Sequence, residues 1–272
     1  MGCREQVIVD DAIHAEVKQH KRDLAEAWID LRKAYDSIYK KWLIEGLQIL
    51  GVPKWIVEFV KRASDKWCTT IMINVKGKTM KSEKIKIQRG IFQGDSLSPL
   101  LFCVCIIPVT LMLRKMKLGY MFGPARKRSL QKMITNLLYM DDMKIYAVQI
   151  SNLRKMLDKA ADMFQTIGLE LGEEKCKIQQ FKHGKKVEGG EQMELQVGKT
   201  LLYLGVGNSY PYLGFIQEES IVHRKIKEEL KREFKKKCKV VWKSELNAKN
   251  KVQAYNELVA AKLTYTFGVV KW

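Results

Sequence analysis

Three aspartates lie where apolar segments of the chain end or turn. Asp30 closes the short apolar segment 27–30, while Asp141 and Asp142 lie within the largely apolar stretch 136–147. The first pattern predicts a buried strand that ends in an acid, and the second predicts a β-hairpin with two acids at its tip. A carboxylate beside an apolar strand is unfavourable unless its charge is compensated, and converging carboxylates repel one another. These acids therefore need a cationic partner.

A pair of Mg²⁺ ions is the partner that these residue types favour. Mg²⁺ prefers hard oxygen ligands and binds one or two carboxylates together with substrate phosphates. Two such ions about 3.5–4 Å apart stabilise both the attacking and the leaving oxygen of a phosphoryl transfer. Asp30, Asp141 and Asp142 are therefore candidate metal ligands for nucleotidyl transfer. The alternative is that Asp141 and Asp142 only form a turn, where aspartate is common.

Five motifs follow one another along the chain, and the first and third of them carry these acids. They are WIDLRKAYDS at 28–37, RGIFQGDSLSP at 89–99, YMDD at 139–142, GLELGEEKCK at 168–177 and YLGF at 212–215. Single residues of these motifs also have an ordinary structural explanation. Tyr35, Tyr212 and Phe215 could be core aromatic residues, and Lys175 is one of 49 basic residues.

The cysteines and histidines form no pattern typical of a metal site or a disulfide framework. None of the six cysteines belongs to a C-x-x-C pair, and the four histidines are scattered. We therefore expect free thiols in a reducing compartment, and neither a zinc site nor a Ser-His-Asp triad. The longest apolar stretch, 100–113, contains Pro108 and is shorter than the about 20 residues that a membrane span needs, so we expect no membrane partner.

The chain is strongly basic, with 49 Lys or Arg against 30 Asp or Glu and a net charge of +19. Such a charge favours a polyanionic partner, above all nucleic acid. Residues 220–272 carry 14 basic and five acidic side chains, and apolar residues recur there every four positions from Val222 to Cys238. This periodicity predicts a helix with one packed face and one basic face. The basic face suits a phosphate backbone, and the alternative is an ordinary solvated surface.

Periodicity, caps and turn residues predict an α+β fold, in which helices accompany an antiparallel sheet. Ser98 and Ser151 are the expected N-caps of two of the helices. A turn at 76–78 is expected to join two strands, the second with one solvated face. The expected helices are 1–25, 38–50, 53–64, 98–115, 151–168 and the region from 221 onward, and the expected strands are 27–30, 69–75, 83–89 and the hairpin 136–147, with further short strands before 220.

Taken together, the ordered motifs resemble the palm of a reverse transcriptase. The wording Q-G-D-S-L-S-P is similar to that of LINE-type, non-LTR retrotransposons, particularly the site-specific insertion elements. The resemblance covers nearly the whole chain, about residues 2–272. It implies a polymerase palm fold with partial fingers and the start of a helical thumb. In these terms, residues 1–25 are a remnant of the fingers, 26–219 the palm with fingers-type helices and a hairpin within 38–90, and 220–272 the start of the basic thumb.

The resemblance also assigns roles to the acids and to a lysine. Asp30 and Asp141 would ligate two catalytic Mg²⁺ ions, with Asp142 in a supporting role. Lys175 matches a lysine that protonates the leaving pyrophosphate. Tyr35 occupies the position of a steric gate, where an aromatic ring excludes the 2′-hydroxyl of ribonucleotides.

Further residues would contact the nucleotide and the primer. Arg89, Gln93 and Gly94 would lie at the nucleotide pocket. Tyr212, Leu213, Gly214 and Phe215 would form the primer-grip hairpin that holds the 3′ end. Asp36 and Asp95 also match family acids, and we expect structural or hydrogen-bonding roles for both. Glu173 departs from the family pattern, which often has a small polar residue there.

The function implied is an RNA-directed DNA polymerase that uses an RNA template, a DNA primer and dNTPs. Family members are longer, so we also expect a truncated copy, and a catalytically inactive nucleic-acid-binding relic stays open as an alternative. An RNA-templated RNA polymerase is a further alternative that Tyr35 disfavours. The family implies a nuclear location, which the run Lys235–Lys239 could serve, and the oligomeric state is left open.

Overall fold

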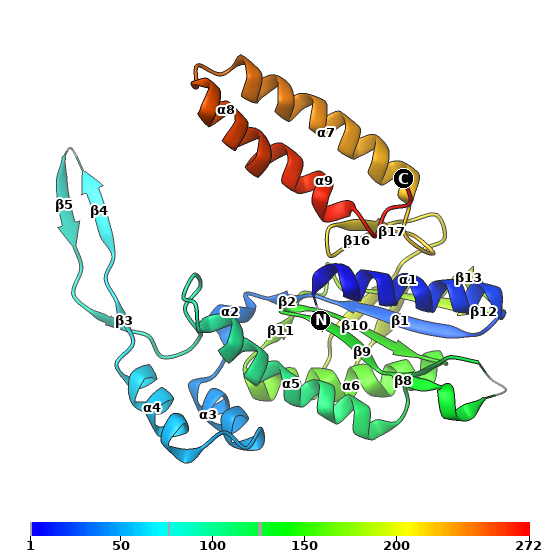
Figure 1. The fold of residues 1–272 in the computed structure, drawn as a ribbon. Helices are drawn as coiled ribbons and strands as arrows, with labels where there is room; N and C mark the ends of the chain where they lie inside the picture. Colours follow the sequence, from blue (N-terminus) through cyan, green and yellow to red (C-terminus); the bar gives the residue numbers. More distant parts are fainter. Residues whose placement is uncertain (1, 76, 125–126) are drawn as a thin grey trace.

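The fold is built on one twisted sheet of seven strands (Figure 1). The computed structural model describes residues 2–75, 77–124 and 127–272. Along the sheet the order is β14-β15-β12-β1-β10-β9, and β13 also pairs with β12. The strands are β1 (Leu24–Ile29), β9 (Asn136–Tyr139), β10 (Asp142–Ala147), β12 (Lys177–Lys182), β13 (Lys185–Val187), β14 (Gln192–Glu194) and β15 (Thr200–Tyr203).

The sheet is mixed, which corrects the expected antiparallel arrangement. Strands β12 and β15 run parallel, whereas the other pairs described in this sheet are antiparallel. The chain between them passes through β13 and β14 and so returns to the same end of the sheet, a longer connection than a hairpin allows. The predicted acid-tipped hairpin is confirmed as β9 and β10. The predicted strand at 27–30 overlaps the last three residues of β1, which begins earlier and ends one residue before Asp30.

Strand β1 lies at the centre of the sheet, and all six of its residues are buried. Alternate side chains of a strand point to opposite faces, so β1 contributes to two separate cores. Ala25, Ala27 and Ile29 face the main core, together with Met143 and Ile145 of β10. Residues on the other face include Leu24 and Trp28, which belong to smaller clusters.

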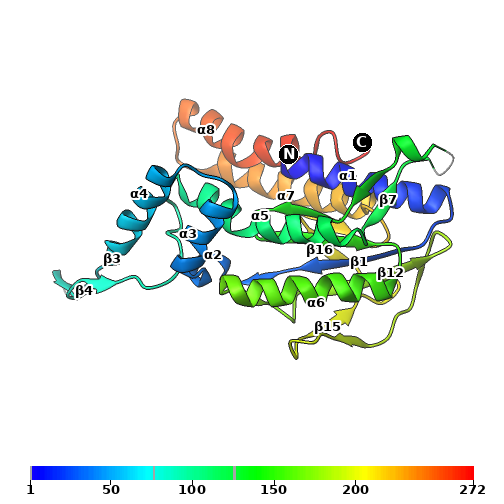
Figure 2. The ribbon, with the colours of Figure 1, turned by 90° about the horizontal axis from the view of Figure 1, so that it is seen from below.

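Two long helices cover the main-core face (Figure 2). They are α5 (Ser98–Met116) and α6 (Ile150–Ile167), and α3 (Lys40–Ile49) packs beside α5. By length and composition α5 could cross a membrane, contrary to the expectation that no segment is long enough. Its buried side chains, such as Phe102 and Val109, belong to the main core, and these contacts account for its apolar composition.

The opposite face of the sheet is covered by α1 (Cys3–Gln19) and by a short hairpin of β16 (Tyr210–Tyr212) and β17 (Phe215–Gln217) (Figure 1). Ile13 and Val17 of α1 pack on Leu24, Tyr146 and Phe181 of the sheet. The segment expected as a fingers remnant therefore packs along this sheet, and its last two residues begin β1.

A slender extension leaves the body of the molecule after α4 (Lys54–Asp65) (Figure 1). It consists of β3 (Cys68–Thr69) paired with β6 (Ile85–Lys86), and of β4 (Met72–Val75) paired with β5 (Lys78–Lys81). The expected strands 69–75 and 83–89 are therefore too long, and the solvated-face prediction is wrong because all residues of β6 are exposed. Lys76 of the predicted turn lies outside the described residues.

The C-terminal segment forms a helical hairpin above the β16–β17 face (Figure 1). Helix α7 (His223–Lys243) is followed by α8 (Ala248–Ala254), a π-helical turn at Tyr255–Ala260 and α9 (Ala261–Thr266). Ile226 and Leu230 are buried against Phe215, which confirms the predicted packed face of this helix at its first turns. The remaining short elements are α2 (Ala34–Ser37), β2 (Leu31–Arg32) with β11 (Glu170–Leu171), and β7 (Tyr120–Phe122) with β8 (Lys132–Ile134), preceded by a short helical turn at Arg128–Leu130.

The helix caps differ from the expected ones. The residues before α5 and α6 are Leu97 and Gln149, neither of which caps with its side chain, so the predictions for Ser98 and Ser151 are wrong. Before α5 the Asp95 carboxylate accepts the Leu97 N–H at 2.8 Å, so the expected hydrogen-bonding role of Asp95 is confirmed.

Candidate active site

Strand pairing brings the three predicted acids to one end of the sheet. Ile29, the last residue of β1, pairs with Met143 of β10. Continuing this antiparallel register by one residue sets Asp30 opposite Asp142, the first residue of β10. Asp141 precedes it in the tight turn, where Met140 has a φ of +53°. Asp30 and Asp141 line the same cleft, of about 360 Å³.

The negative charges of Asp30, Asp141 and Asp142 repel one another. Burial, Asp141 and Asp30 raise the pKa of Asp142 from 3.8 to about 6, and Lys175 only partly opposes them. Burial likewise raises the pKa of Asp30, which Lys175 lowers and Asp141 raises further. The clustered negative charge is therefore under-compensated by the protein itself.

Lys175 approaches the acids from the turn that follows β11. Its Nζ lies 3.6 Å from Asp30 Oδ2, and its side chain is 65% exposed. Solvent screens such an exposed pair, so it contributes little to stability. The exposure leaves the ammonium accessible from the cleft, which it also lines. The structure thus places the Lys175 ammonium beside Asp30.

Two residues that the sequence analysis did not single out fix the position of Asp30. The Gly172 N–H donates to the Asp30 carbonyl at 2.9 Å, and a Cβ at Gly172 would stand 2.6 Å from Asp30 Oδ2. On the same segment, the Asp30 N–H donates to Cys176 Sγ at 3.3 Å. Only glycine leaves room for the Asp30 carboxylate at this point. The sequence signal that could have indicated Gly172 and Cys176 is the segment G-E-E-K-C at 172–176.

Tyr35 and Gln93 line the same cleft as Asp30 and Asp141. The Tyr35 ring stacks on Phe102 of α5 with centroids 4.7 Å apart, which fixes the ring beside the acids. Gly94 follows Gln93 with a φ of +91°, and nothing lies within 4 Å of the place where a Cβ would be. The backbone at Gly94 is therefore open to close approach.

Arg89 lies outside the cleft that Asp30 and Asp141 line. Its guanidinium donates to the Ser37 carbonyl at 2.9 Å and to the Gly168 carbonyl at 3.1 Å. It also stacks over the Tyr39 ring at 5.1 Å. Arg89 lines a different cavity, of about 270 Å³, beside the end of α6. The structure therefore does not bring Arg89 to the cleft of the acids, and its hydrogen bonds join the end of α2 to the end of α6.

The segment predicted as a primer grip forms the β16–β17 hairpin. Tyr212 and Phe215 are buried, whereas Leu213 and Gly214 form the turn with φ values of +47° and +79°. The Tyr265 hydroxyl of α9 donates to the Leu213 carbonyl at 2.8 Å. The two aromatic side chains therefore pack into the protein, whereas Gly214 of the turn is exposed.

By residue type the acids at this end of the sheet suit Mg²⁺, although among the described residues it is Asp10, His14 and Glu26 that bring three ligand atoms within 4.8 Å of one another. Three carboxylates supply hard oxygen ligands, and a divalent cation would remove the repulsion that raises the pKa values of Asp30 and Asp142. Asp30 and Asp141 would hold the ions, with Asp142 beside them.

Comparison with solved structures shows the class of fold. The chain is similar to apo telomerase from Candida tropicalis, with a TM-score of 0.52 and 13% identity, covering 98% of this chain and 46% of that chain. At this identity the likeness concerns the fold alone, and it confirms the predicted polymerase-type α+β fold.

Comparison with known sequences shows the family. Residues 1–217 match the family model described as "Reverse transcriptase (RNA-dependent DNA polymerase)". The chain therefore belongs to the reverse transcriptase family, whose members generally use Mg²⁺.

The relatives are Pol proteins of R2 retrotransposable elements. The chain is 29% identical over 176 residues to the retrovirus-related Pol polyprotein from type-2 retrotransposable element R2DM of Drosophila melanogaster, which is 64% of this chain and 15% of that protein. It is 27% identical over 218 residues to the type-1 R2 Pol polyprotein of Bradysia coprophila, which is 77% of this chain and 23% of that protein. The chain thus spans less than a quarter of the length of each, and it is a reverse transcriptase domain related to R2 non-LTR elements.

The raised pKa of Asp142 predicts a measurable coupling to Mg²⁺. Because the folded-state pKa lies above the ordinary value, protonation of Asp142 stabilises the folded protein at low pH, and this stability is lost as the pH rises through about 6. Carboxyl ¹³C NMR of the metal-free chain should give a midpoint near 6 for Asp142, and Mg²⁺ or the Asp30→Asn substitution should lower it. An ordinary midpoint that Mg²⁺ leaves unchanged would contradict this electrostatic description.

The close approach of Gly172 to Asp30 predicts a selective loss at the site. The added methyl group of Gly172→Ala should rotate the Asp30 carboxylate away and lower Mg²⁺ affinity by about tenfold or more, as misorienting a metal ligand does. Thermal unfolding should change little. Gly190→Ala is the matched control, because its Cβ would meet neighbours only at 3.8 Å or beyond. Equal Mg²⁺ affinity in the two variants would show that Gly172 does not position Asp30.

Proposed function

We propose that this chain is an RNA-directed DNA polymerase domain that adds dNTPs to the 3′-hydroxyl of a DNA primer on an RNA template. The observation that carries the proposal is the register of β1 and β10, which sets Asp30 beside Asp141 and Asp142 at the edge of an open cleft. The R2 relationship supports the choice of reaction.

In the proposed mechanism the protein binds and orients, and Mg²⁺ would supply the stabilisation of charge on the attacking and leaving oxygens. Asp30 and Asp141 hold the site, and the Gly172 contact fixes the direction of the Asp30 carboxylate. Lys175 lies at the cleft with an exposed ammonium, where it can give a proton to the leaving pyrophosphate.

Substrate choice would rest on Tyr35. Its ring is held by Phe102 and lines the cleft, so it can crowd the sugar 2′ position and favour dNTPs over rNTPs. Gln93 and Gly94 would contact the incoming nucleotide, and the open backbone at Gly94 suits that role. The turn at Leu213 and Gly214 would contact the primer, while Tyr212 and Phe215 hold the hairpin in place.

Nucleic acid would be held by the basic surface. The net charge of +19 favours a polyanion, and the exposed lysines of α7 extend along one side of the C-terminal helical hairpin. We propose that this hairpin acts as the thumb on the duplex. A nuclear location stays a prediction.

Substitution of Asp141 tests the proposal. With an RNA template, a DNA primer, Mg²⁺ and dNTPs, Asp141→Asn should lower incorporation on the order of a hundredfold or more, because loss of metal-mediated charge stabilisation raises the barrier by several kcal/mol. Asp162→Asn removes the same charge from an exposed position on α6 and should leave incorporation unchanged.

Equal incorporation by the parent and Asp141→Asn would show that Asp141 is not catalytic. Salt-sensitive RNA binding by a parent protein that incorporates nothing would favour the inactive nucleic-acid-binding relic. Equal use of rNTPs and dNTPs would favour an RNA polymerase.

A further inference from the structure

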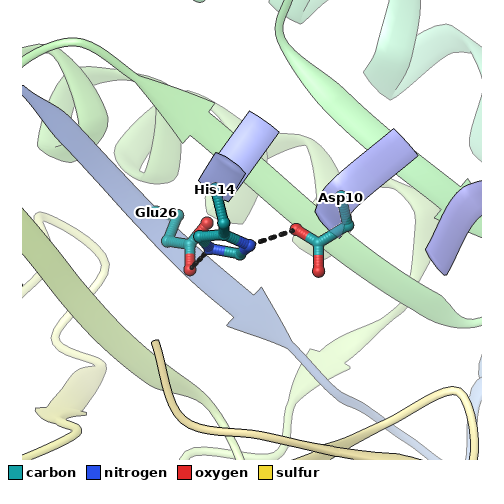
Figure 3. Close-up of side chains that lie close together, drawn as sticks. All are labelled: Asp10, His14 and Glu26. Carbon is teal, nitrogen blue, oxygen red and sulfur yellow. Dashed lines mark hydrogen bonds and ion pairs between the residues drawn. The ribbon is translucent and has the colours of Figure 1, made fainter. Parts of the chain in front are cut away.

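Four ionisable side chains are buried together between the sheet and the elements that cover its α1 face. They are Asp10 and His14 of α1, Glu26 of β1 and Lys144 of β10, and none is more than 1% exposed. Figure 3 shows the His14 ring between the two carboxylates, with its Nε2 3.0 Å from Glu26 Oε1. Nothing in the proposed chemistry uses this cluster, although burying such groups is unfavourable unless they are paired.

Lys144 is the centre of the cluster. Its Nζ donates to Asp10 Oδ1 at 2.8 Å and lies 3.1 Å from Glu26 Oε1. The same ammonium lies over the Trp28 ring at 4.2 Å and 5.5 Å from the centroid of Tyr212. It therefore contacts α1, the central strand β1 and the first strand of the β16–β17 hairpin at once.

Gln217 completes the connection to the hairpin. Its Nε2 donates to Asp10 Oδ2 at 2.6 Å, and its Oε1 accepts from Lys144 Nζ at 3.4 Å. Gln217 is the last residue of β17 and is 1% exposed. Both strands of the hairpin are thus attached to the ammonium of Lys144, one through Tyr212 and the other through Gln217.

The charges of the cluster balance. Burial opposes the ionisation of Glu26, but the charges of His14 and Lys144 outweigh it and hold the pKa of Glu26 at about 2. Burial also lowers the pKa of His14, whereas Glu26 and Asp10 raise it, and the net direction is upward. Two acidic side chains therefore face the His14 ring, whose pKa is raised, and the Lys144 side chain.

A divalent cation fits this cluster poorly. Asp10, His14 and Glu26 each offer a ligand atom within 4.8 Å of the others. However, Asp10 Oδ1 and Glu26 Oε1 already receive the Lys144 ammonium. A metal ion at this place would have to displace the Lys144 ammonium from Asp10 and Glu26, which are its acidic partners in the cluster. The ammonium takes the place that a metal ion would otherwise fill.

The cluster lies next to the candidate active site, on the same face of the sheet. Lys144 pairs with Trp28 across the β1–β10 ladder, and the next positions on the same face of the two strands are Asp142 and Asp30. The side chain that contacts the hairpin is therefore one step along the sheet from the acids. Any displacement of Lys144 changes both the hairpin and the strand that carries Asp142.

We propose that Lys144 is a positioning residue, whose buried ammonium fixes the β16–β17 hairpin relative to the acids at the end of β10. The consequence for primer placement rests on the proposed polymerase function. The attachment itself does not, because it concerns the rigidity of residues 210–217 in the folded chain.

The test compares a charge-matched double variant with the parent chain. Lys144→Met alone removes the basic partner of two buried acids, Asp10 and Glu26, and is expected to prevent folding. Lys144→Met combined with Glu26→Gln keeps the charges balanced and retains the bond between Asp10 and Gln217. Lys182→Met, at an exposed position of β12, is the control for loss of one lysine from the same sheet.

The double variant is expected to melt within about 5 °C of the parent, while amides of 210–217 exchange with solvent about tenfold faster. Incorporation at saturating dNTP should fall about tenfold with the KM for dNTP unchanged, since the primer end rather than the nucleotide is misplaced. Lys182→Met should match the parent in all three measurements.

Parent-like exchange and incorporation in the double variant would show that Lys144 only balances charge, and would overturn the proposal. If the parent incorporates nothing, the polymerase function fails, and exchange at 210–217 still decides the role of Lys144. A further measurement needs no variant. In the ¹⁵N-labelled parent, Lys144 should give a slowly exchanging ammonium signal with contacts to the Trp28 and Tyr212 rings, and its absence would contradict the attachment.

Discussion

Five residue pairs join β1 to β10, from Ala25 with Ala147 to Ile29 with Met143, and their register determines which side chains share a face of the sheet. A slip of one residue would turn each β1 side chain to the opposite face. Glu26 and Asp30 would then point into the apolar core beneath α5 and α6, without partners. Burial of Ala25, Ala27 and Ile29 on one side therefore holds the acids on the other side, so the register depends on packing as much as on backbone hydrogen bonds.

On the face of the sheet that carries these acids, the side chains change from apolar to charged toward the cleft. Leu24 and Tyr146 lie in an apolar cluster, Glu26 and Lys144 follow in a buried polar layer, and Asp30 and Asp142 come last, at the cleft. Charge is balanced in the buried layer but left unbalanced at the cleft, where Asp142 has a pKa raised to about 6. Such local frustration is typical of sites that bind an ion or a substrate, because the ligand supplies the missing charge.

Features encoded by neighbouring residues were predictable from the sequence. The β9–β10 hairpin followed from apolar residues on both sides of Asp141, and the end of α6 followed from Gly168, which has a φ of +95°. The N-cap predictions were wrong because serine suits several positions at the start of a helix. The path of the chain before each helix determines which of these positions Ser98 and Ser151 occupy.

Features that join distant segments were not predictable from the residues alone. Lys144 and Asp10 are 134 positions apart, and the pattern of β10 gives no sign that this lysine points into a buried layer. The glycine at 172 is explained by the nearby Asp30 carboxylate, which lies far away in the sequence. Arg89 was assigned by its motif, although its guanidinium donates to carbonyls at the ends of α2 and α6. In each case the information lies in tertiary packing rather than in local spacing.

Iron-directed cleavage tests most directly whether the acids of β1 and β10 share an ion. Fe²⁺ binds at oxygen ligand sites in place of Mg²⁺, and with peroxide it generates radicals that cut nearby backbone. If the acids share an ion, we expect cuts around residue 30 and around residues 141–142 of the same chain, both suppressed by excess Mg²⁺. Cleavage confined to one of the two segments would contradict a shared site.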